Sequence, residues 1–204
     1  MTTNATTIGI EKTIGIIGAG TMGAGIAQLA ATTGHPVLLY DAFDGAAEKG
    51  KARIASDLKA LVARGKKSQA EVEALLGRII IATALDDLSD VALVVEAIVE
   101  DLDLKRALFG RLEDIVSKDA ILASNTSSIS LTAIARDLKR PDRFVGMHFF
   151  NPAPVMKLVE VISGMATTPE VAGTVFATAE AWGKIAVHAK SAPGFIVNRV
   201  ARPY

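Results

Sequence analysis

The sequence has no cysteine among its 204 residues, and this absence excludes disulfide bonds, thiolate metal sites and cysteine nucleophiles. It also lacks an excess of charge of either sign, since 22 basic residues balance 22 acidic ones. This balance leaves no electrostatic footprint for nucleic acid or for an anionic membrane surface, and we expect neither as a partner. Small-molecule partners are therefore favoured.

Long hydrophobic runs are missing too, although half of the residues are hydrophobic and a substantial core can form. The longest apolar runs, such as residues 14–17 and 91–95, are far shorter than the roughly 20 residues that span a bilayer. Residues 1–11 are polar and Thr-rich, without the basic start and apolar run of a signal peptide. We expect a cytoplasmic protein whose residues 1–11 form a flexible tail.

Short, β-branched apolar runs alternate with longer stretches of helical spacing along most of the chain. The predicted strands cover residues 13–17, 37–40, 79–82, 91–95 and 120–123. The predicted helices cover residues 21–33, 46–63, 69–76 and 102–116. Because the apolar runs do not alternate with polar residues, they are typical of parallel strands buried on both faces. The pattern predicts an α/β fold: a Rossmann-type, doubly wound, mostly parallel sheet over residues 12–188.

The C-terminal third predicts three more strands, a helix and a linker. The strands cover residues 143–149, 157–162 and 185–188, and the helix covers residues 169–182. Thr168 followed by Pro169 suits the N-cap and first turn of that helix. Residues 189–194 gather Ser, Pro and Gly and are typical of a linker, and residues 195–201 have helical spacing. We interpret residues 189–204 as a linker and the start of a truncated helical domain.

A glycine-rich turn follows the first strand directly and precedes the first helix. Its residues are Gly18, Ala19, Gly20, Thr21, Met22 and Gly23, with the spacing GxGxxG. In a dinucleotide site, the first glycine permits the tight turn, the second lets the backbone approach the pyrophosphate, and the third lets helix and strand pack closely. The helix N-terminus supplies amides and a positive dipole for the anion. This context predicts a dinucleotide cofactor.

Asp41 ends the second predicted strand, at the spacing where an acid binds the adenosine ribose. A carboxylate there accepts hydrogen bonds from the ribose hydroxyls and repels a 2′-phosphate. Residues 42–44 offer no arginine to compensate that repulsion. NAD is therefore favoured over NADP.

Four further segments carry a family resemblance, together with the glycine turn. They are Asn125-Thr126-Ser127-Ser128, the run from Arg143 through His148-Phe149-Phe150-Asn151-Pro152, the run Val155 to Glu160, and the run Pro193 to Arg199. These segments resemble the 3-hydroxyacyl-CoA dehydrogenase family over nearly the whole chain. Residues 38–41, 127–135 and 198–204 are similar, more narrowly, to the bacterial 3-hydroxyadipyl-CoA dehydrogenases of phenylacetate breakdown.

The resemblance implies that NAD oxidises a 3-hydroxyacyl-CoA to the 3-ketoacyl-CoA, with His148 as the general base. Imidazole titrates near neutral pH, so it can take the hydroxyl proton and return it in the reverse reaction. Glu160, on the neighbouring predicted strand, would fix the imidazole tautomer and stabilise the imidazolium. An isolated histidine is more often a structural core residue, and we interpret His35 and His188 in that way.

Other site residues follow from the resemblance alone. Ser127 and Asn198 match the family's catalytic and substrate-contacting hydroxyl and amide, and Ser127 also matches a cofactor contact; outside the family both would be turn or cap residues. Glu100, Lys105 and Asn151 match further cofactor contacts. Glu100 and Lys105 equally suit a solvated pair on one helix face.

The substrate's CoA group has a less well matched site between Asp41 and Ile79. Arg64 takes the place of a family lysine and is our candidate substrate contact, although a solvated basic helix end suits it equally. Asp57 takes the place of a family serine, and its carboxylate would repel the CoA phosphates. No metal is expected.

Two other functions remain open: another β-hydroxy acid dehydrogenase with a lysine base, and a non-catalytic NAD-binding module. The resemblance also implies that the whole protein is a homodimer through a C-terminal helical domain. We expect residues 193–204 to pack poorly without that domain, and residues 1–204 alone to bind NAD but to turn over slowly.

Overall fold

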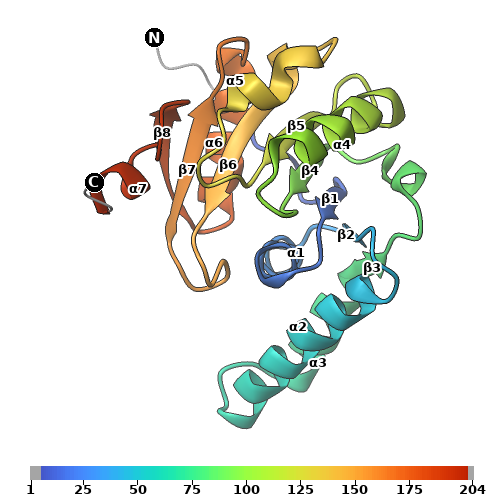
Figure 1. The fold of residues 1–204 in the computed structure, drawn as a ribbon. Helices are drawn as coiled ribbons and strands as arrows, with labels where there is room; N and C mark the ends of the chain where they lie inside the picture. Colours follow the sequence, from blue (N-terminus) through green and yellow to red (C-terminus); the bar gives the residue numbers. More distant parts are fainter. Residues whose placement is uncertain (1–5, 202–204) are drawn as a thin grey trace.

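The computed structural model describes residues 6–201, which form one eight-stranded sheet with helices on both faces (Figure 1). The strands are β1 (Ile14–Ile17), β2 (Val37–Tyr40), β3 (Ile79–Ile81), β4 (Leu93–Glu96), β5 (Ile121–Ser124), β6 (Phe144–Phe149), β7 (Leu158–Ser163) and β8 (Ile185–Lys190). The α-helices are α1 (Thr21–Thr33), α2 (Ala46–Ala63), α3 (Gln69–Arg78), α4 (Leu102–Ile115), α5 (Leu131–Ile134), α6 (Pro169–Ala181) and α7 (Val197–Ala201). This is the predicted doubly wound architecture.

The strand order is β3-β2-β1-β4-β5-β6-β7-β8, and only β6 and β7 pair in antiparallel fashion. The chain leaves β1 toward β2 on one side and returns to β4 on the other side. The order therefore reverses at β1, and the crevice beyond the carboxyl ends of β1 and β4 is where such sheets bind ligands. The glycine turn begins at this point, directly after Ile17.

Two hydrophobic clusters cover the two faces of the sheet. One cluster joins the sheet to α1, α2, α3 and α6, and the other joins it to α4 and α5. The α2–α3 hairpin projects beyond β3, away from the other helices (Figure 1). Its turn ends in a capping box, in which the Ser68 side chain accepts from the Glu71 backbone N–H and the Glu71 carboxylate accepts from the Ser68 backbone N–H.

The predicted elements agree with the structure to within a few residues. Thr168 caps α6, as predicted, with its hydroxyl oxygen 3.3 Å from the Val171 backbone nitrogen. Strand β8 continues to Lys190, two residues into the segment predicted as a linker, because it pairs in parallel with β7 over six residues. Helix α5 and the 3-10 turns at Leu85–Leu88, Ala135–Asp137 and Pro141–Arg143 were not predicted, since one helical turn carries too little periodicity.

The predicted tail is attached to the domain from Ile8 onward. The Ile8 backbone N–H donates to Thr178 Oγ1 across 3.1 Å, and the Ile8 side chain packs against the core. Residues 1–5 of that predicted tail lie outside the described residues, as do residues 202–204 of the predicted C-terminal segment. Within residues 6–201, no helix is both long enough and apolar enough to cross a membrane.

Phe109 is the interior residue of α4 whose removal should most clearly destabilise the domain. Its ring is fully buried and meets Phe144 edge to face at a centroid distance of 4.7 Å. We predict that Phe109→Ala lowers the free energy of unfolding by about 3–5 kcal/mol, measured by urea denaturation. Leu104→Ala, on the exposed side of the same helix, is the control and should change it by less than about 0.5 kcal/mol. Equal losses in both variants would contradict this packing.

Candidate active site

The glycine turn has the geometry that a dinucleotide requires. Gly18 has a φ of +92°, and a Cβ there would lie 2.6 Å from the Ala97 carbonyl oxygen at the end of β4. A Cβ on Gly23 would lie only 1.7 Å from the Gly18 carbonyl oxygen, so only glycine lets α1 approach β1 this closely. By contrast, a Cβ on Gly20 would meet open space. The open side at Gly20 fits the approach of a pyrophosphate to the backbone.

Asp41 lies directly beside this turn. Its Oδ2 accepts from the Ala19 backbone N–H at 2.7 Å, and its Oδ1 accepts from the Phe43 backbone N–H at 3.0 Å. Each carboxylate oxygen can accept a further hydrogen bond. The two backbone bonds therefore fix the carboxylate while leaving acceptor positions for ribose hydroxyls. The residues present fit the adenosine half of NAD.

His148 and Glu160 form a buried pair across β6 and β7. They are directly opposite each other in the antiparallel register, which places their side chains on the same face of the sheet. His148 Nδ1 lies 2.7 Å from Glu160 Oε2, and the two residues are 5% and 0% exposed. The rings of Phe150 and Phe195 flank the imidazole. Because Nδ1 faces the carboxylate, Nε2 is the nitrogen left to exchange a proton.

The segment after β8 closes over this pair. Glu160 Oε1 accepts from the backbone N–H groups of Ile196 and Val197, both at 2.9 Å. Asn198 Nδ2 donates to the Ser127 carbonyl oxygen at 3.1 Å, and Phe195 is buried. The expectation that residues 193–204 pack poorly is therefore wrong for residues 195–198: the Glu160 carboxylate binds the backbone of two of them, and the side chains of the other two are packed or hydrogen-bonded.

Glu100 organises the turn that carries Ser127. Its Oε1 accepts from the Thr126 hydroxyl at 2.6 Å and from the backbone N–H groups of Ser127 and Ser128 at 2.9 and 3.1 Å. Burial raises the pKa of Glu100, but the hydrogen bonds from Thr126 and Ser127 and the charge of Lys105 outweigh burial and lower the pKa overall. The ionised Glu100 carboxylate therefore holds residues 126–128 in place, and we call this segment the serine turn.

Lys105 does not lie on a solvated helix face but is buried between two carboxylates. Its Nζ donates to Glu96 Oε1 at 2.5 Å and lies 3.4 Å from Glu100 Oε2, and the residue is 1% exposed. This burial excludes the solvated helix-face pair, whereas the assignment of Lys105 as a cofactor contact stays a prediction; its ammonium lies beside Glu100. The charge of Lys105 is thus used to hold the serine turn.

Glu96 was not singled out from the sequence. It is fully buried at the carboxyl end of β4, where its Oε2 accepts from the Ser124 hydroxyl at 2.7 Å and its Oε1 from the Ile98 backbone N–H at 2.7 Å. The available signal was an acid directly after the apolar run at residues 91–95. With Lys105, it links the ends of β4 and β5 beneath the site.

The two remaining predicted contacts, Asn151 and Arg64, lie in different places. Asn151, after β6, is exposed and lines a cavity together with Thr21 of the glycine turn. Arg64 is the C-cap of α2, on the projecting hairpin, and is not among the residues that line this cavity. Asp57, on the same helix, does line it. The structure thus brings Asn151 to the site and leaves Arg64 apart from it.

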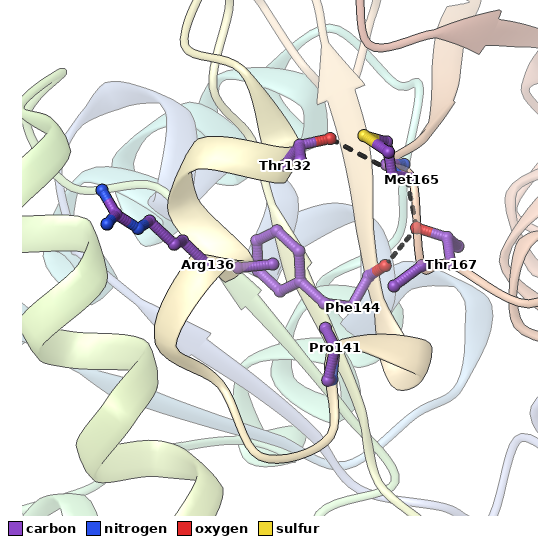
Figure 2. Close-up of a pocket in the computed structure, with 9 residues that line it drawn as sticks. Thr132, Arg136, Pro141, Phe144, Met165 and Thr167 are labelled. Carbon is purple, nitrogen blue, oxygen red and sulfur yellow. Dashed lines mark hydrogen bonds between the residues drawn. The ribbon is translucent and has the colours of Figure 1, made fainter.

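A second cavity lies at the opposite end of β6 and contains none of the predicted site residues. It has a volume of about 170 Å³ and is lined by Phe144, Arg136 and Met165, among others (Figure 2). The Thr132 hydroxyl accepts from the Met165 backbone N–H, and the Thr167 hydroxyl donates to the Phe144 carbonyl (Figure 2). Within residues 6–201, no cluster of His, Asp and Glu could hold a metal ion.

Comparison with known proteins decides the family. The family model described as "3-hydroxyacyl-CoA dehydrogenase, NAD binding domain" matches residues 13–192, most of the chain. The chain belongs to the 3-hydroxyacyl-CoA dehydrogenase family. NAD is accordingly its cofactor, in agreement with the glycine turn and Asp41.

Relatives of the 3-hydroxyacyl-CoA dehydrogenase family match nearly all of this chain. The chain is 50% identical over 193 residues to 3-hydroxyadipyl-CoA dehydrogenase of Escherichia coli, covering 95% of this chain and 41% of that protein. It is 44% identical to 3-hydroxybutyryl-CoA dehydrogenase of Clostridioides difficile, covering 93% and 68%. A crystal structure of 3-hydroxybutyryl-CoA dehydrogenase from E. coli superposes with a TM-score of 0.93 at 49% identity, covering 97% of this chain and 42% of that one. The chain thus spans about two fifths of the E. coli relative.

Asp41 should set the choice of cofactor in this dehydrogenase domain. We predict that the chain binds NADPH at least tenfold more weakly than NADH, which corresponds to about 1.4 kcal/mol. Asp41→Ala should narrow that gap, because it removes the charge that repels the 2′-phosphate. Calorimetric titration with NADH and with NADPH measures the two affinities in the unmutated chain and in the variant. Equal affinities in the unmutated chain would contradict the role of Asp41.

Glu100 should make a pH-dependent contribution to stability. Because its pKa is lowered in the folded state, the contribution is present above the unfolded pKa and is lost as the pH falls through the folded pKa. We predict that Glu100→Gln destabilises the domain at pH 7 and that the difference from the unmutated chain shrinks in the acid range. Urea denaturation between pH 7 and pH 4 measures this, with exposed Glu170→Gln as the control. A stability difference that does not change with pH would show that the charge of Glu100 does not stabilise the serine turn.

Proposed function

We propose that this chain is the NAD-binding part of an enzyme that oxidises a 3-hydroxyacyl-CoA to the 3-ketoacyl-CoA. The observation that carries the proposal is the buried His148–Glu160 pair, whose side-chain atoms are 2.7 Å apart. His148 lies near the carboxyl end of β6, and the glycine turn follows the carboxyl end of β1, which runs in the same direction. The oxidation removes a hydride from carbon 3 and a proton from its hydroxyl group. When bound, NAD supplies the hydride acceptor.

His148 is the group that takes the hydroxyl proton. With Nδ1 donating to Glu160, the Nε2 lone pair is free to accept the proton, and the imidazolium that forms is stabilised by the carboxylate. The aromatic rings of Phe150 and Phe195 exclude water from the imidazole. In the reverse reaction the same nitrogen returns the proton to the 3-keto oxygen.

Ser127 and Asn198 position the reacting oxygen. The Asn198 amide already donates to the Ser127 carbonyl, so the two residues lie side by side although they are 71 positions apart. The Ser127 hydroxyl lies 3.3 Å from Glu100, a long contact that it can exchange for a hydrogen bond to substrate. Both side chains then polarise the oxygen and hold carbon 3 in place for hydride transfer.

The substrate is, by the same proposal, a CoA thioester of the kind that the relatives are named for. The 50% identity to a 3-hydroxyadipyl-CoA dehydrogenase favours an acyl chain of that kind, as in phenylacetate breakdown. Because the relatives are longer, we also propose that residues 1–204 alone bind NAD but turn over slowly. Measuring kcat/KM of the intact protein with 3-hydroxybutyryl-CoA and with 3-hydroxyadipyl-CoA shows which acyl chain it prefers.

Removing the imidazole tests the proposed activity. In the intact protein we predict that His148→Ala lowers kcat by roughly 10²- to 10⁴-fold and leaves the NADH affinity almost unchanged. Glu160→Gln should act in the same direction, because the amide keeps the shape but loses the negative charge. The assay follows NADH consumption with acetoacetyl-CoA. Full activity in Glu160→Gln would contradict its role, and the absence of turnover in the unmutated protein would favour a non-catalytic module.

A further inference from the structure

A cavity of about 320 Å³ opens beside the glycine turn, between α1, α2 and the segment that follows β6. Its walls include Thr21 of α1, Arg53 and Asp57 of α2, and Asn151. The segment after β6 lies close against α1, since a Cβ on Gly25 would be 3.2 Å from Ala153. In Figure 1 the turn between β6 and β7 lies beside α1 in the same way. The cavity therefore adjoins the dinucleotide site.

Arg53 supplies the positive charge of this cavity. Its Nη2 donates to the Ala19 carbonyl oxygen at 3.0 Å, while the Ala19 N–H donates to Asp41. The side chain is exposed, and no carboxylate among residues 6–201 forms an ion pair with it. A guanidinium has five N–H donors in a planar fork that matches phosphate. Arg53 is thus hydrogen-bonded to the glycine turn and has no ion-pair partner among the described residues.

A second source of positive potential points to the same place. Helix α1 has 13 residues, and its N-cap, Gly20, provides no side-chain cap, so the N-terminal amides of the helix stay open to an anion. Thr21 of that first turn lines the cavity together with Arg53. Asp57 lies one helical turn beyond Arg53 along α2, away from the glycine turn. The cavity is therefore positive at its inner end and negative farther out.

We propose that Arg53 is a binding residue for a nucleotide phosphate at the inner end of this cavity. The phosphate belongs either to the dinucleotide or to the CoA group of the substrate, and both ligands present the same chemistry to a guanidinium. Arg53 lies 11 residues before Arg64, roughly 16 Å along the helix, so it is much nearer the glycine turn than the contact predicted from the resemblance. The location of the site rests on the proposed function, whereas the role of Arg53 rests on the cavity.

The test measures the binding of NADH, NADPH and CoA separately to the 204-residue chain by calorimetry. Arg53→Ala should weaken at least one of these ligands about tenfold, and the salt dependence of that ligand's affinity should fall in the variant. Lys59→Ala is the matched control: it removes one charge from the same helix outside the cavity and should leave all three affinities unchanged. Asp57→Asn should strengthen the ligand that Arg53→Ala weakens.

The three ligands separate the sources of the phosphate. A loss confined to NADH and NADPH assigns Arg53 to the dinucleotide pyrophosphate, a loss confined to NADPH assigns it to the 2′-phosphate, and a loss confined to CoA assigns it to the substrate. If the unmutated chain binds these ligands and Arg53→Ala binds all of them equally well, the inference is wrong while the proposed function stands. If the unmutated chain binds none of them, both are wrong.

Discussion

Glu160 is the buried carboxylate on which the candidate active site depends. One of its oxygens binds the imidazole of His148, and the other accepts two backbone N–H groups from Ile196 and Val197. A charge taken out of water needs several such partners, because its solvation is otherwise lost. The same requirement therefore orients the imidazole and draws the segment after β8 over it. Ser127 and Asn198 meet as a result of that closure.

A second group of charges, in which Glu96 and Lys105 are buried and Glu100 lies at the surface, supports the other side of the site. Glu96 and Glu100 share the ammonium of Lys105, and the hydrogen bonds of Glu96 to Ser124 and of Glu100 to Thr126 tie this group to β5 and to the turn that follows it. Removing Glu96 or Lys105 would leave the other one buried without its nearest partner. The serine turn is thus fixed by electrostatics as well as by packing, which suits a loop that must hold a reacting oxygen in place.

The fold was predictable because its signals are local. Uninterrupted β-branched runs and helical spacing gave the elements, and the glycines with Asp41 gave the cofactor. Long-range pairing was not predictable in the same way: nothing in the sequence shows that Lys105 meets Glu96, or that Arg53 reaches the Ala19 carbonyl from a different helix. The closure of residues 195–198 was missed for the same reason, since the partner is a carboxylate on a strand 36 positions earlier.

The β6–β7 pairing also bears on the order in which the site comes apart. His148 and Glu160 are 12 positions apart and are joined by one hairpin, whereas Asn198 and Ser127 are 71 positions apart and meet only when the segment after β8 is in place. A contact of the first kind needs only the β6–β7 hairpin, whereas a contact of the second kind needs two distant segments to be in place at once. Displacing α7 would therefore separate the amide from the serine turn while the imidazole and its carboxylate stay paired. The base is built into the sheet itself, and the groups that position the substrate oxygen are brought to it from two separate parts of the chain.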